Sequence, residues 1–208
     1  MILIYLGFLF MFTKIDVNFL KEIRNNFAKL TGLFITFVDH YGNFIIPEIG
    51  KRDFCIYVKK LKLNKICDNS NTYWVKKAVK TKKSYIYTCP FGLTEIVVPL
   101  VVANKCIGAV LTGQVRTQNS ILCLPNNYEV PSTKYITLKN KYNKVPILSK
   151  QFLAATKDFI NHIINYIFKV DFEALSSKFV TSKEFSKFNK MIVKNTKKYI
   201  EKNLSEKK

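Results

Sequence analysis

Residues 95–113, EIVVPLVVANKCIGAVLTG, decide the fold of this 208-residue chain. They hold two apolar runs rich in β-branched residues, 95–102 and 106–113, and such runs predict strands. Only residues 103–105 connect the two runs. Because so short a connection must turn tightly, we expect the two strands to pair antiparallel.

The segment before this hairpin predicts a helix, a strand and a tight turn. Asp16 is a suitable N-cap, Gly32 stands at the C′ position, and apolar residues between them recur at helical spacing: Leu20, Ile23, Phe27 and Leu30. The run 33–38 then predicts a strand. Residues 39–43, DHYGN, predict a hairpin turn before a second strand at 44–46.

Two helices are predicted between this turn and the hairpin, at residues 53–60 and 70–82. The second has an apolar face of Tyr73, Trp74, Val75 and Ala78 against a lysine-rich one. Further on, residues 117–148 are polar, carry three prolines and give no clear assignment.

A long helix is predicted to start near Ser149, with an apolar stripe of Phe152, Phe159, Ile163, Tyr166, Ile167, Val170 and Ala174. Residues 181–184, TSKE, predict a capping box that restarts a helix. We therefore expect an apolar N-terminal extension (1–13), an α+β sensory domain (14–148) and a helical output segment (149–208). A homodimer through the C-terminal helices is an open alternative, because apolar residues recur there: Phe172, Leu175, Phe179, Phe185, Phe188 and Ile192.

The charge and cysteine content limit the classes of function. The net charge is +20, yet only three basic residues are arginines, so we attribute the lysines to an A/T-rich codon composition, and a lysine-rich nucleic-acid-binding protein is the alternative. Five cysteines without a CxxC pair argue against a disulfide framework. Residues 1–12 are too few to span a bilayer and lack the basic leader of a secretory signal, so we expect a cytoplasmic protein without a membrane partner.

Unusual residues concentrate in residues 54–114. Glu95 and Gln114 stand amid apolar strands, and residues 89–92, CPFG, predict a bend between two strand-like runs. A few aimed polar groups within apolar walls are typical of a small-molecule pocket. The alternative interpretation makes Glu95 a solvated strand residue and Gln114 a hydrogen-bonding strand end. The candidate ligand-binding residues are Phe54, Cys67, Trp74, Tyr87, Cys89, Phe91, Glu95 and Gln114.

Four ordered motifs resemble the PocR sensory domain: DFC at 53–55, CDNS at 67–70, YTCPFGLTEIVVP at 87–99 and IGAVLTGQV at 107–115. The resemblance covers roughly residues 14–120. It implies a PAS/GAF-like α+β fold with an antiparallel sheet and flanking helices. It also implies that the domain senses small hydrocarbon derivatives such as propanediol, as the input module of a kinase or an AraC-type transcription regulator.

One position departs from the family, because many members carry a histidine where this chain has Pro90. Cys55, Cys67 and Cys89 could still bind a metal with one further ligand, but their spacing is unlike common zinc modules. We therefore expect neither metal nor cofactor, and a Cys-based metal or redox sensor remains an alternative. No nucleophile elbow, phosphate loop or HExxH is present, so we expect no enzyme activity.

The C-terminal residues 197–207 resemble the opening of the AraC-type DNA-binding domain. The helix-turn-helix pairs that would follow are not in this chain, so we expect DNA contact only through a domain outside it. The sequence thus predicts a non-enzymatic sensory domain that binds a small organic compound and signals through a C-terminal helix.

Overall fold

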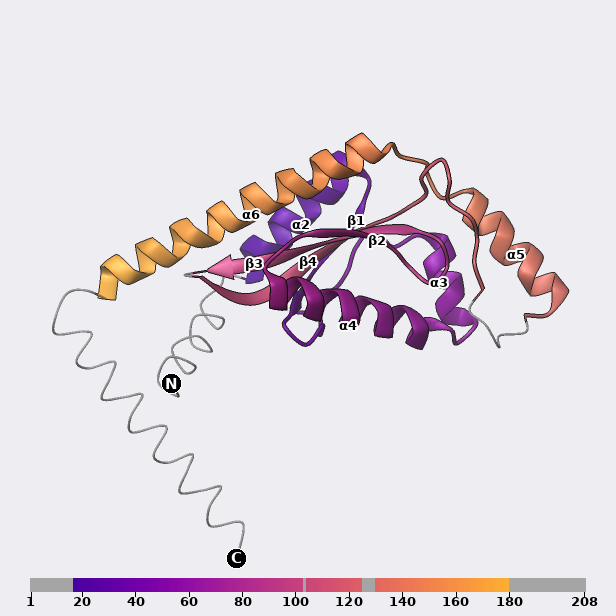
Figure 1. Ribbon diagram of the computed structural model, residues 1–208, viewed down its shortest axis with the longest axis horizontal. Coiled ribbons are helices and arrows are strands. Elements are labelled where there is room, and N and C mark those ends of the chain that lie inside the picture. Colours follow the sequence, from indigo (N-terminus) through magenta and orange to yellow (C-terminus); the bar gives the residue numbers. More distant parts are fainter. Residues whose placement is uncertain (1–16, 103, 125–129, 180–208) are drawn as a thin grey trace, which may run out of the picture. The chain divides into compact units, whose positions relative to one another are not determined.

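The computed structural model describes residues 17–102, 104–124 and 130–179 (Figure 1). Its elements are, in chain order, α2 (Val17–Thr31), β1 (Phe34–Asp39), α3 (Asp53–Lys60), α4 (Asn64–Thr81), β2 (Tyr85–Thr88), β3 (Thr94–Val102), β4 (Lys105–Val115), α5 (Ser132–Asn143) and α6 (Lys150–Phe179). Residues 17–168 form one compact unit. The predicted division at residues 13 and 148 stays a prediction.

The four strands form one antiparallel sheet in the order β1-β4-β3-β2. The predicted hairpin is confirmed as β3 and β4, and the strand-like run before the 89–92 bend is β2. Tight turns join β2 to β3 and β3 to β4, whereas β1 pairs with β4, which lies far from it in the sequence. The α+β class with an antiparallel sheet and flanking helices is confirmed.

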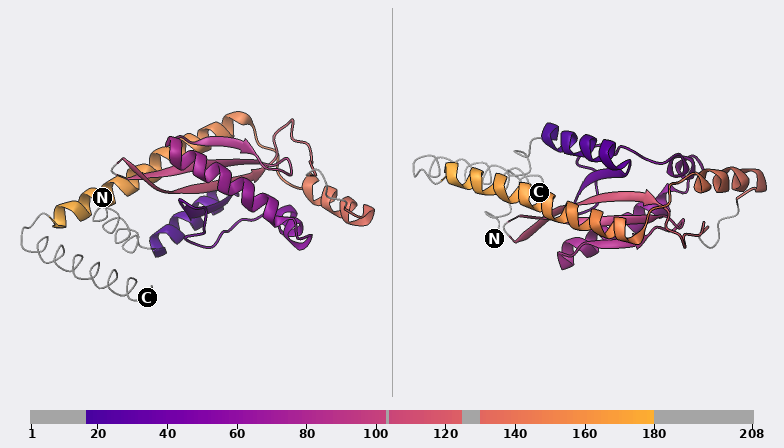
Figure 2. Two further views of the ribbon diagram at one scale, coloured as in Figure 1. Left: turned by 60° about the horizontal axis from the view of Figure 1, so that its bottom comes forward. Right: turned by 90° about the horizontal axis from the view of Figure 1, so that it is seen from above.

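Helices cover both faces of the sheet. α4 lies on one face, whereas α2 and α6 lie on the other (Figures 1 and 2). Val75 and Ala78 of α4 belong to one buried cluster that also holds Phe34 and Val38 of β1. On the other face, Oδ1 of Asn165 on α6 accepts a 2.8 Å hydrogen bond from the backbone N–H of Val101.

The predicted turn after β1 is confirmed, but the strand after it is not. Oδ1 of Asp39 accepts hydrogen bonds from the backbone N–H groups of Tyr41 and Asn43, at 2.8 and 2.9 Å. Residues 44–46 do not form a regular strand, and the return segment meets β1 through isolated bridges at Phe44 and Ile49 and through a 3.0 Å hydrogen bond from the Thr36 hydroxyl to the carbonyl of Ile46. Pro47 interrupts the segment because it has no N–H to donate to a ladder.

Two helical faces differ from their prediction. Leu30 is 81 % exposed, and Arg24 is buried between Leu20 and Phe27 instead. The Arg24 guanidinium donates to the carbonyl of Pro47, which explains how a charged side chain occupies this position. On α4, Tyr73 is exposed, while Val75 and Ala78 form the buried face. α4 also begins at Asn64, six residues before its predicted start.

α6 starts where it was predicted, because Oγ of Ser149 accepts a 3.1 Å hydrogen bond from the backbone N–H of Phe152. Its predicted apolar stripe does not face the sheet: the side chains from Phe152 to Tyr166 in that stripe are 41–66 % exposed. The inward positions are Leu153, Thr156, Ile160 and Ile164.

α5 lies within the tract that the sequence left unassigned, and it buries only Leu138 and Tyr142.

Several predictions fall outside the described residues: the N-cap at Asp16, the extension 1–13, the capping box at 181–184 and the side chains of the dimerisation stripe from Phe172 on. Among the helices that the structure describes, none combines the length and apolarity needed to cross a bilayer.

Candidate functional site

A buried carboxyl group lies at the centre of the candidate site. Glu95 on β3 stands directly opposite Tyr87 on β2, and only 6 % of its surface is exposed. The Tyr87 hydroxyl donates a 2.8 Å hydrogen bond to Oε2 of Glu95. The alternative in which Glu95 is a solvated strand residue is therefore wrong.

The second carboxylate oxygen, Oε1, accepts no hydrogen bond from any residue that the structure describes. On β4, Glu95 faces Gly113, which contributes no side chain. Because ionised carboxylates accept several hydrogen bonds, Oε1 retains the capacity to bind a further donor.

The face of α4 that looks toward this pair carries Cys67, Asn71 and Trp74, at the helical spacing of i, i+4 and i+7. The Trp74 ring stacks on that of Tyr87, with centroids 4.9 Å apart and an interplanar angle of 18°. Oδ1 of Asn71 lies 3.1 Å from the Tyr87 hydroxyl. Asn71 was not selected in the sequence analysis. Its helical spacing from Cys67 and Trp74, two of the predicted ligand-binding residues, indicated that it lies on the same face of the helix.

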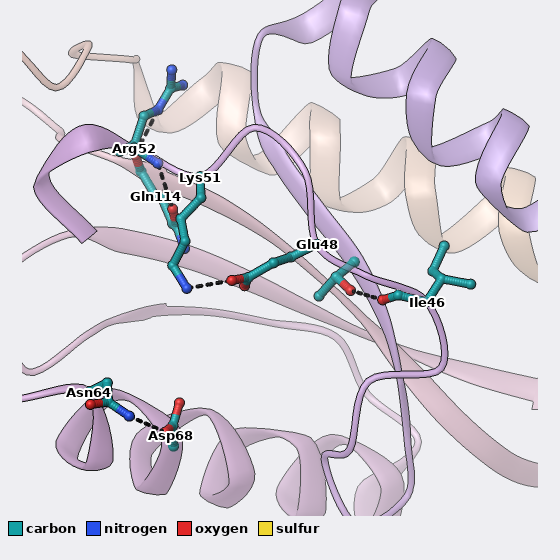
Figure 3. A network of polar contacts seen from close by, with 8 residues as sticks. Ile46, Glu48, Lys51, Arg52, Asn64, Asp68 and Gln114 are labelled. Atoms are coloured by element: carbon teal, nitrogen blue, oxygen red, sulfur yellow. Dashed lines mark hydrogen bonds and ion pairs between the residues drawn. The ribbon is translucent and has the colours of Figure 1, made fainter. Parts of the chain in front are cut away.

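Burial determines the electrostatics of Glu95. It raises the pKa of the carboxyl from 4.5 to about 7, against the hydrogen bond from Tyr87 and the charge of Lys51, which lower it. Lys51 is itself engaged, because its ammonium group lies 2.5 Å from Oε1 of Glu48 (Figure 3). The nearby lysine therefore offsets only part of the penalty for burying this carboxyl.

Gln114 is placed near Glu95 by an irregularity in the sheet. Thr94 pairs with Val115 and Glu95 with Gly113, so Gln114 is an extra residue on β4. It has a left-handed φ of +57° and is buried. Its Oε1 accepts a 3.2 Å hydrogen bond from the backbone N–H of Arg52, just before α3, as Figure 3 shows. The Gln114 amide oxygen thus holds the start of α3.

The aromatic residues Phe54 and Phe91 belong to a separate cluster together with Cys89. Both rings are 1 % exposed, and the Phe54 ring meets those of Phe91 and Tyr142 edge-on at 6.3 and 5.3 Å. They fill the space among α3, the β2–β3 turn and α5. The structure therefore gathers Glu95, Tyr87 and Trp74 at one place, and it sets Phe54 and Phe91 in a neighbouring core.

Cys55, Cys67 and Cys89 pack in or against this core, and all are free thiols. Burial, followed by the charge of Glu95, raises their pKa values, that of Cys67 to about 12. Within residues 17–102, 104–124 and 130–179, no group of three His, Cys, Asp or Glu side chains is arranged to hold a metal ion. The three thiols named in the metal-site alternative therefore pack with apolar side chains, and their raised pKa values keep them protonated.

A groove of about 750 Å³ lies elsewhere, between the loop after β4 and the first turn of α6. Its walls include Thr117, Asn119, Ile147, Ser149 and Lys150. None of the predicted ligand-binding residues lines it.

The fold and the site define an α+β domain that buries an ionisable polar cluster between its sheet and a helix. Residues 13–171 match the family described as the sensory domain found in PocR. The chain belongs to this family, so the predicted resemblance is confirmed and the chain contains a sensory domain.

A curated relative and a solved structure are similar to the chain. The regulatory protein PocR of Salmonella typhimurium (strain LT2) is 26 % identical over 163 residues, which are 76 % of this chain and 52 % of the relative. The chain thus spans about half the length of this relative. A GAF domain/HD domain protein from Geobacter sulfurreducens is 12 % identical, with a TM-score of 0.31, over 69 % of this chain and 93 % of that structure.

Proposed function

We propose that this sensory domain binds a small hydroxylated organic compound, such as a short diol or alcohol, at the site of Glu95 and Tyr87. The observation that carries the proposal is the buried carboxyl of Glu95, which has one hydrogen bond from Tyr87 and one oxygen with no donor among the described residues. Because no buried side-chain N or O atom of the described residues lacks a hydrogen-bond partner, this oxygen keeps some contact with solvent, and a ligand hydroxyl would take the place of water there.

The surroundings support a ligand that is compact and partly apolar. Trp74 lies against Tyr87 and provides an aromatic wall, while Asn71 adds an amide at the same place. Sites of this kind combine apolar walls with a few polar groups that fix the orientation of the ligand. A ligand carboxylate would meet the charge of Glu95 above the pKa of that group, so we expect acids to bind worse than alcohols.

Contacts at the end of β4 support a route from this site to α6. Arg116, two residues after Gln114, donates its backbone N–H to the carbonyl of Pro146 and accepts from the N–H of Leu148, both at 2.9 Å. Its Nε donates to the carbonyl of Val145 at 3.0 Å. Since α6 begins at Lys150, a shift at this end of β4 would reach the first turn of the helix.

We further propose that the domain acts in the cytoplasm, without catalysing a reaction, as the input half of a transcription regulator. The curated relative of which this chain spans half is a regulatory protein. DNA contact would then belong to a domain of AraC type outside this chain.

A thermal-shift titration of the full chain tests the binding proposal. The probes are 1,2-propanediol, ethanol, propionaldehyde and propionate. The diol or the alcohol should raise Tm, by an amount equivalent to about 2.7 kcal/mol at about 100 times Kd. Glu95→Gln and Tyr87→Phe should remove this response, whereas Asp53→Asn, a change at an exposed carboxylate on α3, should keep it. Equal responses in the parent and both site variants would exclude this site.

Hydrogen exchange tests the route. Binding of the effective probe should change the exchange of residues 150–156 in the parent. Arg116→Ala should still bind the probe but lose this change. A variant that keeps both properties would show that the side-chain contacts of Arg116 do not carry the signal.

A further inference from the structure

α6 exposes a line of large apolar side chains beside its buried face. Phe152, Phe159, Ile163 and Tyr166 are 41, 52, 43 and 66 % exposed. Leu153, Ile160 and Ile164 of the same helix are at most 4 % exposed and pack inward. At 100° per residue the two lines are about 110° apart, so packing on the sheet does not use the first line.

The spacing of the exposed line matches a helix-pairing seam. Phe152, Phe159 and Tyr166 recur at intervals of seven, and Ile163 stands four residues after Phe159 and three before Tyr166. The step of four and then three from Phe159 to Tyr166 matches the a/d pattern through which two helices pack side by side, whereas the intervening position between Phe152 and Phe159, Thr156, is buried. The partner that fits such a seam is another helix with the same repeat.

The exposed area is sufficient for the apolar part of a dimer interface. An aromatic side chain offers about 150–250 Å², so the exposed fractions of the four residues amount to roughly 400 Å². A standard interface covers about 800 Å² per partner, somewhat more than half of it apolar. A patch of this size lies within the range of about 300–600 Å² for the largest apolar patch of a monomeric protein, and such patches are often functional.

The seam is also free of charge, which matters in a chain of net charge +20. Its exposed flanking positions hold Ala155 and His162. The nearest described charges, Lys157 and Asp158, form an ion pair at 3.1 Å. Two copies can therefore approach along this line without opposing lysines.

We propose that a second copy of this chain docks on the exposed line of α6, so that the protein is a homodimer whose two α6 helices pack against each other. Phe159 lies at the centre of the line between Phe152 and Tyr166. The two-fold axis of the dimer passes beside it, and Phe159 contacts its counterpart in the other copy. This interface is separate from the Glu95 site.

Sedimentation analysis of the full chain over a range of concentrations tests the proposal. The parent should be a dimer that dissociates on dilution, and Phe159→Glu should raise the dimer Kd by about 100-fold or more, because it buries a charge at the centre of the interface. Ile136→Glu is the matched control, since Ile136 on α5 is also a large exposed aliphatic residue, at 58 %. The far-ultraviolet circular dichroism of both variants should match the parent.

A parent that stays monomeric at about 100 μM would overturn the proposal. Crosslinking gives a second readout that does not depend on tolerance of a charge. Phe159→Cys in a Cys123→Ser background should form a disulfide-linked dimer on mild oxidation, and Ile136→Cys should not. Equal crosslinking of the two would equally overturn the proposal.

Discussion

The Tyr87 hydroxyl on β2 donates a 2.8 Å hydrogen bond to the carboxyl of Glu95 directly opposite on β3. Both side chains are buried, at 4 and 6 % exposure. Burial raises both pKa values, and the charge of Glu95 raises that of Tyr87 further. The pair therefore retains the Tyr87 proton, while Glu95 changes charge near neutral pH.

Stability should fall as the pH rises through neutrality. Between pH 4.5 and about 7 the folded protein keeps the proton of Glu95, whereas the unfolded chain loses it. The free energy of unfolding should therefore decrease across this window, by roughly 3 kcal/mol in total. Denaturant titrations at a series of pH values measure this decrease.

The Glu95→Gln variant has no titratable group at this position. Its free energy of unfolding should therefore lack the decrease of roughly 3 kcal/mol expected for the parent. Glu22→Gln is the control, because Glu22 is an exposed carboxylate on α2. It should keep the slope of the parent. A parent and a Glu95→Gln variant with parallel pH profiles would mean that Glu95 titrates in the folded state as it does in the unfolded chain.

Four of the five thiols should separate by reactivity. Cys123 is exposed, while Cys89 is buried, Cys55 and Cys67 are partly buried, and the pKa values of these three are raised. Because the thiolate is the nucleophile, Ellman's reagent at pH 8 should modify Cys123 rapidly and the other three only after unfolding. Cys123→Ser should remove the rapid phase. Rapid modification of the three in the native protein would instead favour the redox-sensor alternative.

Local patterns were sufficient to predict much of the fold. The β3–β4 hairpin follows from two apolar runs joined by three residues, and the end of α2 follows from Gly32, whose φ is +65°. The segment 44–46 was wrong as a strand, and α5 was missed, because α5 buries only two side chains and has little apolar periodicity to detect.

The site was only partly predictable, for a physical reason. The Glu95–Tyr87 pair joins strands linked by one tight turn, so the sequence separation between the two residues is only eight. Gln114 and Arg52, in contrast, are 62 residues apart, and their contact depends on the sheet irregularity that makes Gln114 an extra residue. No local pattern contains that information.

Two glycines with positive φ should respond very differently to alanine. At Gly92 a Cβ would lie 1.8 Å from the carbonyl oxygen of Ile121, while at Gly32 it would have no neighbour within 4 Å. Gly32→Ala should cost about 1 kcal/mol, from the left-handed conformation alone. Gly92→Ala should cost at least about 3 kcal/mol, because the β2–β3 turn must move away from Ile121. Denaturant unfolding compares the two, and equal costs would contradict the close approach at Gly92.

The orientation of α6 can be tested with two isoleucines three residues apart. Ile160 is 2 % exposed and Ile163 is 43 % exposed, although the periodicity of the sequence placed Ile163 on the main apolar stripe. Ile160→Ala should lower the free energy of unfolding by about 2–5 kcal/mol, because it leaves a cavity against the sheet. Ile163→Ala should lower it by less than about 1 kcal/mol when measured at concentrations where the chain is monomeric. Since the residue type, the helix and the substitution are the same, a difference in the opposite direction would mean that α6 packs on the sheet through the stripe that its sequence suggests.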